Sequence, residues 1–228
     1  MAAEQYEDII AFASDFSGGD PAIVERVREM AAAPPTDMET VGFYGGEDYP
    51  ERSRVFLATV SLLEDAGKLS SIEDKYSAEI FAIWAEDGTI IADALPPLVK
   101  AVFGPLRDGE EPAGGVGPYR ELVWQNYAQA TKDLEHDIAA RGKVLLSVDA
   151  TEGDTMFFAL VTPAVAERWQ GRALSEQNGY QSGVRPPMWD RLWDNLLYST
   201  GGLMADETQK GLPPGTAVST GPLQPYSR

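Results

Sequence analysis

The sequence contains no cysteine among its 228 residues, and it contains a single histidine. A disulfide framework, a thiolate nucleophile and a zinc site built on sulfur are therefore excluded. One histidine also excludes a histidine-rich metal centre. No stretch approaches the roughly 20 consecutive apolar residues that a membrane-spanning helix needs. We therefore expect no membrane association and no catalytic chemistry that depends on sulfur.

Basic residues are scarce. The chain has 18 Lys and Arg residues against 36 Asp and Glu residues, a formal net charge of −18 at pH 7. This charge repels phosphate backbones and anionic lipid headgroups, so we expect neither nucleic acid nor a membrane as a partner. The first fifty residues hold eleven carboxylates against only Arg26 and Arg28. Two explanations stay open: an acidic face that binds a basic partner, and ordinary solubilising charge.

The N-terminal residues also lack the features of a secretory signal. Met1–Asp8 is acidic, whereas such a signal begins with basic residues and continues into an apolar run. We therefore predict a cytoplasmic protein. The hydrophobic content of 43% suffices for a core without a metal or a disulfide. We expect one globular domain over residues 1–200 with a Gly/Pro-rich loop near 104–118, and an extended or partly disordered tail over 201–228.

Apolar residues at helical spacing recur along the chain. Tyr6, Ile9, Ile10 and Ala13 predict a short first helix, which the glycines before Asp20 end. Further helices are predicted from Asp20-Pro21 to Ala33, over Arg54–Ala66, over 75–86, from Pro96, over 119–140, from Pro163 to Trp169 and over 187–198.

Strand patterns are fewer. Lys68–Glu73 is a candidate strand, although the periodicity equally permits a helix from Ile72 onward. Residues 143–149 and 155–161 flank a glycine-containing turn at 150–154, which predicts a β-hairpin. Residues 36–50 fit a loop or a short edge strand. The sequence therefore predicts an α+β fold, a helix-rich domain with a small sheet that includes a β-hairpin and with a flexible C-terminal tail.

Carboxylates at the predicted hairpin turn are the best candidates for metal chemistry. Asp149, Glu152 and Asp154 offer three oxygen ligands for calcium or magnesium. Their spacing does not match a calcium-binding loop, and hairpin turns favour aspartate and glycine for conformational reasons alone. We therefore assign no metal ligand here.

Two catalytic motifs are incomplete. Ser182 lies in Gly179–Gly183, which misses the spacing of the Gly-x-Ser-x-Gly nucleophile elbow by one residue. The glycines of 114–117 follow no predicted strand and do not complete a dinucleotide-binding motif. No cofactor is therefore predicted.

Three other groups of residues are candidates for catalysis or binding. His136 lies in a polar run of the long predicted helix, which favours a solvent-facing histidine over a catalytic one. Asp48 and Glu51 near Tyr44 and Tyr49 could line a pocket, but no second catalytic group accompanies them. The aromatic face of the helix over 187–198 fits a docking surface or, as we expect, a helix that seals the core. We assign no catalytic or cofactor-binding residue.

Two segments carry a family resemblance. Leu62–Gly67 leads into Ser71–Lys75 and Glu79–Phe81, and the strand ending Phe158–Pro163 leads into a helix through Glu167. This arrangement resembles a family of bacterial proteins catalogued only as a domain of unknown function. The resemblance implies an α+β domain with a small sheet and supports a strand at 68–73. It supplies no catalytic residue.

The residues favour one function and leave a second open. The acidic charge and the absence of complete catalytic motifs predict a noncatalytic intracellular interaction protein, comparable to acidic immunity proteins that neutralise basic toxins. The alternative is a small-molecule enzyme that uses carboxylates, with a divalent cation held at a site such as Asp149, Glu152 and Asp154.

Overall fold

The structure is a computed structural model. It describes residues 3–43, 48–73, 128–129, 131–136, 138–150, 155–177, 179–189, 191 and 223–225. The chain divides into two compact units. The first comprises Met1–Ser71, Leu145–Pro186 and Gly221–Arg228, and the second comprises Ile72–Val144 and Pro187–Thr220. A single domain over residues 1–200 with a separate tail stays a prediction.

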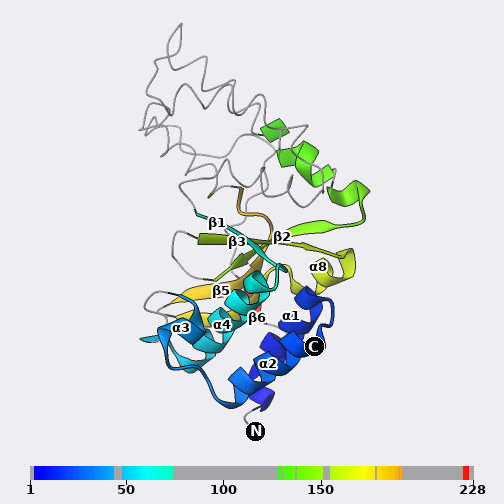
Figure 1. Cartoon of the computed structure of the whole chain (residues 1–228). Coiled ribbons are helices and arrows are strands. Elements are labelled where there is room, and N and C mark those ends of the chain that lie inside the picture. The colour runs from blue at the N-terminus through cyan, green and yellow to red at the C-terminus, as the bar shows by residue number, and fades with distance from the viewer. Residues whose placement is uncertain are drawn as a thin grey trace, which may run out of the picture. The chain divides into compact units, whose positions relative to one another are not determined.

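The helices of the first unit come mostly from its N-terminal part. They are η1 (Ala3–Tyr6), α1 (Glu7–Ser17), α2 (Pro21–Ala32), α3 (Met38–Val41), α4 (Glu51–Asp65) and α8 (Pro163–Trp169). Helices α1, α2 and α4 pack against one another, α3 packs on α4, and α1 contacts α8 (Figure 1). Helix α4 also contacts strand β4 (Arg172–Gln177), which joins the helices to the sheet.

The sheet has six strands in the order β1-β3-β2-β5-β4-β6. The other strands are β1 (Ser70–Glu73), β2 (Val144–Asp149), β3 (Thr155–Val161), β5 (Tyr180–Arg185) and β6 (Gln224–Pro225). Strand β5 lies antiparallel to both β2 and β4, while β6 lies parallel to β4. The predicted α+β class, the strand near 68–73 and the hairpin of β2 and β3 are confirmed.

The first two helices follow from local sequence. Helix α1 forms as predicted, but Ile10 is half-buried and the buried face runs through Ile9, Phe12, Ala13 and Phe16. The Asp20 side chain caps α2 by accepting a hydrogen bond from the Ala22 backbone N–H at 2.9 Å, with proline at the first helical position.

Helix α4 is the central helix of the first unit. It begins at Glu51, three residues before the predicted start, and the chain leaves it through Gly67 at φ 65° as predicted. Its residues 55–60 are all buried, because α1, α2, α3 and β4 contact it. The buried face of α4 is therefore wider than the apolar stripe expected from Val55, Thr59, Leu62 and Leu63.

Residues 36–50 contain a one-turn helix, α3, where a loop or a short edge strand was expected. The Asp37 carboxylate accepts hydrogen bonds from the Thr40 backbone N–H at 2.8 Å and from the Thr40 hydroxyl at 3.0 Å. Gly42 then ends the turn at φ 78°, and a Cβ there would lie 2.2 Å from Ser61 Oγ. Only glycine satisfies both the backbone angle and the contact with α4.

Strands β4 and β5 were not predicted. They form a hairpin that pairs Gln177 with Tyr180, and Gly179 in the turn has φ 84°. The Asn178-Gly179 dipeptide is a strong hairpin signal in the sequence. The strands around it are polar, as the sequences RALSEQ and YQSGVR show, so they lack the apolar alternation that identifies a strand.

The described helical residues of the second unit are 128–129, 131–136, 138–140, 189 and 191. Leu134 and Ile138 are buried, and Gly142 ends the helix at φ 69°, as predicted. Trp189 is also buried, and its indole N–H donates to Glu135 Oε1 at 2.8 Å. Trp189 thus packs inward, as the core-sealing interpretation of residues 187–198 requires.

Several predictions lie outside the described residues. They are the helices over 75–86 and from Pro96, the loop over 104–118, the helix over 119–127, the turn over 151–154, the helix over 192–198 and the tail apart from Leu223–Pro225. Within the described ranges, none of the helices is long and apolar enough to cross a membrane.

Candidate functional site

Asp149, the last residue of β2, is a buried carboxylate at the junction of β2 and β5. Its side chain is 4% exposed, and its partner Arg185 is 13% exposed. One carboxylate oxygen accepts from Arg185 Nε at 2.7 Å, and the other accepts from the Tyr180 hydroxyl. Burying two unpaired charges would cost several kcal/mol each, so this pairing is what permits both groups inside the protein.

Gly183 of β5 permits the close approach of the β4 backbone. Gly183 lies opposite Asp149 in the strand register, and a Cβ on Gly183 would lie 2.1 Å from the Arg172 carbonyl oxygen. The neighbouring Ser182 is buried and donates its hydroxyl to the Ala150 carbonyl at 2.7 Å. The Ser182-Gly183 pair therefore joins β5 to the end of β2 and to its bulged neighbour β4.

Of the three candidate metal ligands, Asp149 alone lies within the described residues. Both oxygens of Asp149 already accept hydrogen bonds, so a cation there would compete with Arg185 and Tyr180. Glu152 and Asp154 lie outside the described residues. Over the ranges that are described, no cluster of three His, Asp or Glu side chains is placed to hold a metal ion.

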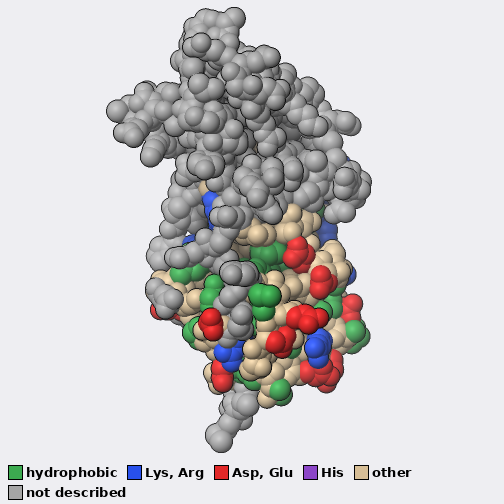
Figure 2. All heavy atoms as spheres, turned by 60° about the vertical axis from the view of Figure 1, so that its left-hand side comes forward, with side chains coloured by type: hydrophobic (Ala, Val, Ile, Leu, Met, Phe, Trp, Pro, Cys, Tyr) green, Lys and Arg blue, Asp and Glu red, His purple; other side chains and the backbone are tan. Residues whose placement is uncertain are grey.

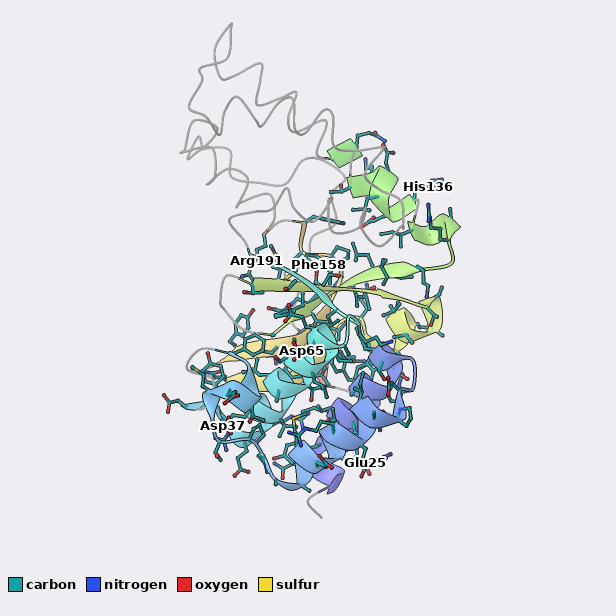
Figure 3. The ribbon with its side chains drawn as sticks, in the orientation of Figure 1. Glu25, Asp37, Asp65, His136, Phe158 and Arg191 are labelled. Carbon is teal, nitrogen blue, oxygen red and sulfur yellow. The ribbon has the colours of Figure 1, made fainter. Side chains whose placement is uncertain are left out.

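The other sequence candidates lie on the surface. His136 is exposed on its helix, as predicted (Figure 3). Asp48 and Glu51 are exposed and Tyr49 is half-buried, while Tyr44 lies outside the described residues. The structure therefore places Asp48 and Glu51 in solvent.

Many N-terminal carboxylates are used within the fold. Asp8 pairs with Arg52, and Asp20 caps α2. Asp15 accepts from the Trp169 indole N–H at 2.7 Å and pairs with an Arg168 guanidinium nitrogen at 2.9 Å. Glu25 and Glu29 pair with Arg28 and Arg26 on the exposed face of α2. These groups stabilise the fold, so the acidity of the first fifty residues is not a single free surface.

A smaller surface around α3 keeps its carboxylates available. We call it the α3 surface; it consists of Asp37, Met38, Glu39, Asp48 and Glu51, all exposed. Within the part of the chain that the structure describes, no ion pair engages Glu39, Asp48 or Glu51. Met38 is 47% exposed and is the one large hydrophobic side chain among the described residues that is exposed.

Arg54 holds the two segments of the α3 surface together. Its Nε donates to the Pro35 carbonyl at 2.6 Å and its Nη1 donates to the Tyr49 carbonyl at 2.8 Å. These carbonyls lie two residues before Asp37 and one residue after Asp48. One half-buried guanidinium therefore joins the segment that precedes α3 to the segment that precedes α4. Figure 2 shows acidic side chains spread over the described part of the surface, with basic side chains beside some of them.

The Asp37 cap predicts a measurable titration. The Thr40 backbone N–H, and then the Thr40 hydroxyl, hold the pKa of the Asp37 carboxyl below its ordinary value of 3.8. Because this pKa is lower in the folded state, the cap contributes its stability above pH 3.8 and loses it as the pH falls through the folded pKa. Carboxyl NMR titration should give a midpoint below 3.8, and Thr40→Val should move it upward. A midpoint at or above 3.8 in the unchanged protein would contradict the cap.

Sequence reasoning found Asp149 but missed its partners and missed the exposure of Met38. Tyr180 and Arg185 lie 31 and 36 residues after Asp149, on a hairpin for which Asn178-Gly179 was the available signal. No sequence signal separates an exposed methionine such as Met38 from a buried one.

Comparison with known proteins supplies no relative: no protein-family model, no curated protein sequence and no solved structure matches this chain. Functional inference therefore rests on the residues of the chain itself.

Proposed function

We propose that this chain is a noncatalytic interaction protein that binds a basic protein partner through the α3 surface. One observation carries the proposal: an exposed methionine stands among exposed carboxylates that form no ion pair with any other described residue. Protein interfaces combine an apolar anchor with a polar rim, and methionine is an adaptable anchor. A basic partner with an apolar depression would complement both features.

The net charge of −18 supports the same class of partner. Summed charge steers diffusional encounter toward a molecule of opposite sign and adds rate more than affinity. Local carboxylates then fix where the partner docks. Binding by this chain would resemble neutralisation of a basic toxin by an acidic immunity protein, with the complex weakening as salt rises.

Two further expectations belong to this proposal. A cytoplasmic location is the first of them. Membership in the uncharacterised bacterial family is supported by the segments 62–67 and 158–163, which carry the resemblance.

The proposal is tested first by affinity purification of the tagged full chain at low and at moderate salt, with mass spectrometry of the recovered proteins. We expect a basic protein in near-equal amount that moderate salt releases. Its affinity, measured with the purified partner by calorimetry, should fall about tenfold or more in the double variant Glu39→Lys with Asp48→Lys, because like charges then face each other.

A matched control separates the α3 surface from net charge alone. The double variant Asp65→Lys with Glu167→Lys makes the same change in charge at two exposed carboxylates outside that surface. Asp65 lies at the far end of α4, roughly 20 Å along the helix from Glu51 at 1.5 Å per residue. Equal losses in both double variants would refute the α3 surface, and recovery of no basic partner would refute the function.

A further inference from the structure

The described methionines differ sharply in their access to solvent. Met30, Met156 and Met188 are buried in the structure, with at most 5% exposed, whereas Met38 is 47% exposed. A thioether is oxidised where an oxidant can reach its sulfur. Within the described residues, Met38 is therefore the methionine that a dissolved peroxide reaches first.

We propose that Met38 is a site of reversible oxidation that controls binding at the α3 surface. This inference rests on the proposed function for its consequence, although the oxidation itself can be measured without a partner. The Met38 sulfur would then regulate binding at the same surface that binds the partner.

The oxidation step is balanced with hydrogen peroxide as the oxidant. The Met38 sulfur attacks one peroxide oxygen, the O–O bond breaks, and an S–O bond forms. The sulfur loses two electrons, the peroxide is reduced, and water leaves after proton transfer. A methionine sulfoxide reductase restores the thioether at the expense of a thiol reductant, so the change is reversible.

The residues around Met38 explain why its sulfoxide should weaken binding at the α3 surface. Sulfoxide formation converts a flexible apolar side chain into a polar one. Asp37 and Glu39 flank Met38 in the chain and are exposed, and Met38 is the one large hydrophobic side chain that is exposed among the described residues. Oxidation therefore removes the apolar anchor while leaving the surface charge unchanged, which predicts weaker binding at unchanged salt dependence.

The test treats the full chain with graded hydrogen peroxide and measures each methionine by peptide mass spectrometry. Given their exposures, sulfoxide should form at Met38 about tenfold faster than at Met30, Met156 or Met188. Affinity for the purified partner from the salt experiment should fall about tenfold, the change expected when burial of one methionine side chain is lost, and reductase should restore it.

Met38→Leu is the matched variant, because leucine keeps an apolar side chain of similar volume and resists oxidation. Whatever its affinity before treatment, the variant should keep that same affinity after peroxide, so the ratio of the two affinities should stay at about one. Met1 and Met204 remain in this variant, so a loss of affinity in Met38→Leu after peroxide would overturn the proposal. Oxidation at Met38 no faster than at the buried methionines would also overturn it. If the reduced chain binds no basic protein, the proposed function fails, and regulation of binding fails with it, while the mass spectra still decide whether Met38 is the oxidation site.

Discussion

Replacing Asp149 by leucine should lower the free energy of unfolding by about 3–5 kcal/mol, the cost of leaving one charge of a buried pair without its partner. Arg185, 13% exposed, would keep its charge without the carboxylate that now lies 2.7 Å away. The Tyr180 hydroxyl would lose its acceptor as well. Urea denaturation followed by circular dichroism measures the change.

Two further variants test whether the charge pair is the cause. Adding Arg185→Met to Asp149→Leu should recover most of the loss, because the guanidinium that lost the Asp149 carboxylate is then absent as well. Glu176→Ala, an exposed carboxylate on the neighbouring strand β4, should change stability by less than about 0.5 kcal/mol. A loss below about 1 kcal/mol for Asp149→Leu would show that Asp149 does little for the fold and would reopen the carboxylate-enzyme alternative.

Trp169→Ala should lower the free energy of unfolding by about 3–5 kcal/mol, as truncation of a fully buried aromatic residue does. Trp169 is fully buried, and its ring meets Phe12 edge-on at 5.7 Å between centroids. Its indole N–H donates to Asp15, so one side chain joins α8 to α1 by packing and by a hydrogen bond. Thermal or urea unfolding gives the measurement.

The hydrogen bond and the packing can be separated. Trp169→Phe keeps most of the ring area but removes the donor, and should cost about 1–2 kcal/mol. Arg168→Ala removes the ion pair to Asp15, and because Arg168 is 45% exposed the loss should stay below about 1 kcal/mol. If Arg168→Ala destabilised the protein as much as Trp169→Ala, the ion pair rather than the aromatic packing would join these helices.

The elements that could be predicted are those whose formation depends on residues close together in the chain. The Asp20-Pro21 start of α2 was readable because an aspartate cap and a proline each act within three residues. The hairpin of β2 and β3 was readable because its strands are apolar and a short glycine-containing sequence separates them. Helix α3 was missed because a single turn carries too few residues for periodicity, although Asp37 and Gly42 cap it at both ends.

Tertiary contacts decide the parts that were missed. The polar strands β4 and β5 are stabilised by pairing with each other and with β2, and by the contact of β4 with α4. Nothing near Asp149 in the chain indicates that Tyr180 and Arg185 will reach it. The exposure of Met38 likewise depends on which side of α3 packs on α4, and a four-residue helix does not reveal that from its sequence.

The chain order of the first unit has a consequence for biosynthesis. Helices α1, α2 and α4 are translated before any residue of β2 to β6, because residues 72–144 of the other unit come between them. These helices can pack on one another at once, but the face of α4 that contacts β4 has no partner until residues 172–177 have been made. A nascent chain therefore carries an uncovered apolar helix face for the time needed to translate about a hundred codons, at roughly 5–20 residues per second. Chaperones that hold such apolar faces near the ribosome should therefore raise the folding yield of this protein, and slow codons within 72–144 should prolong the exposure.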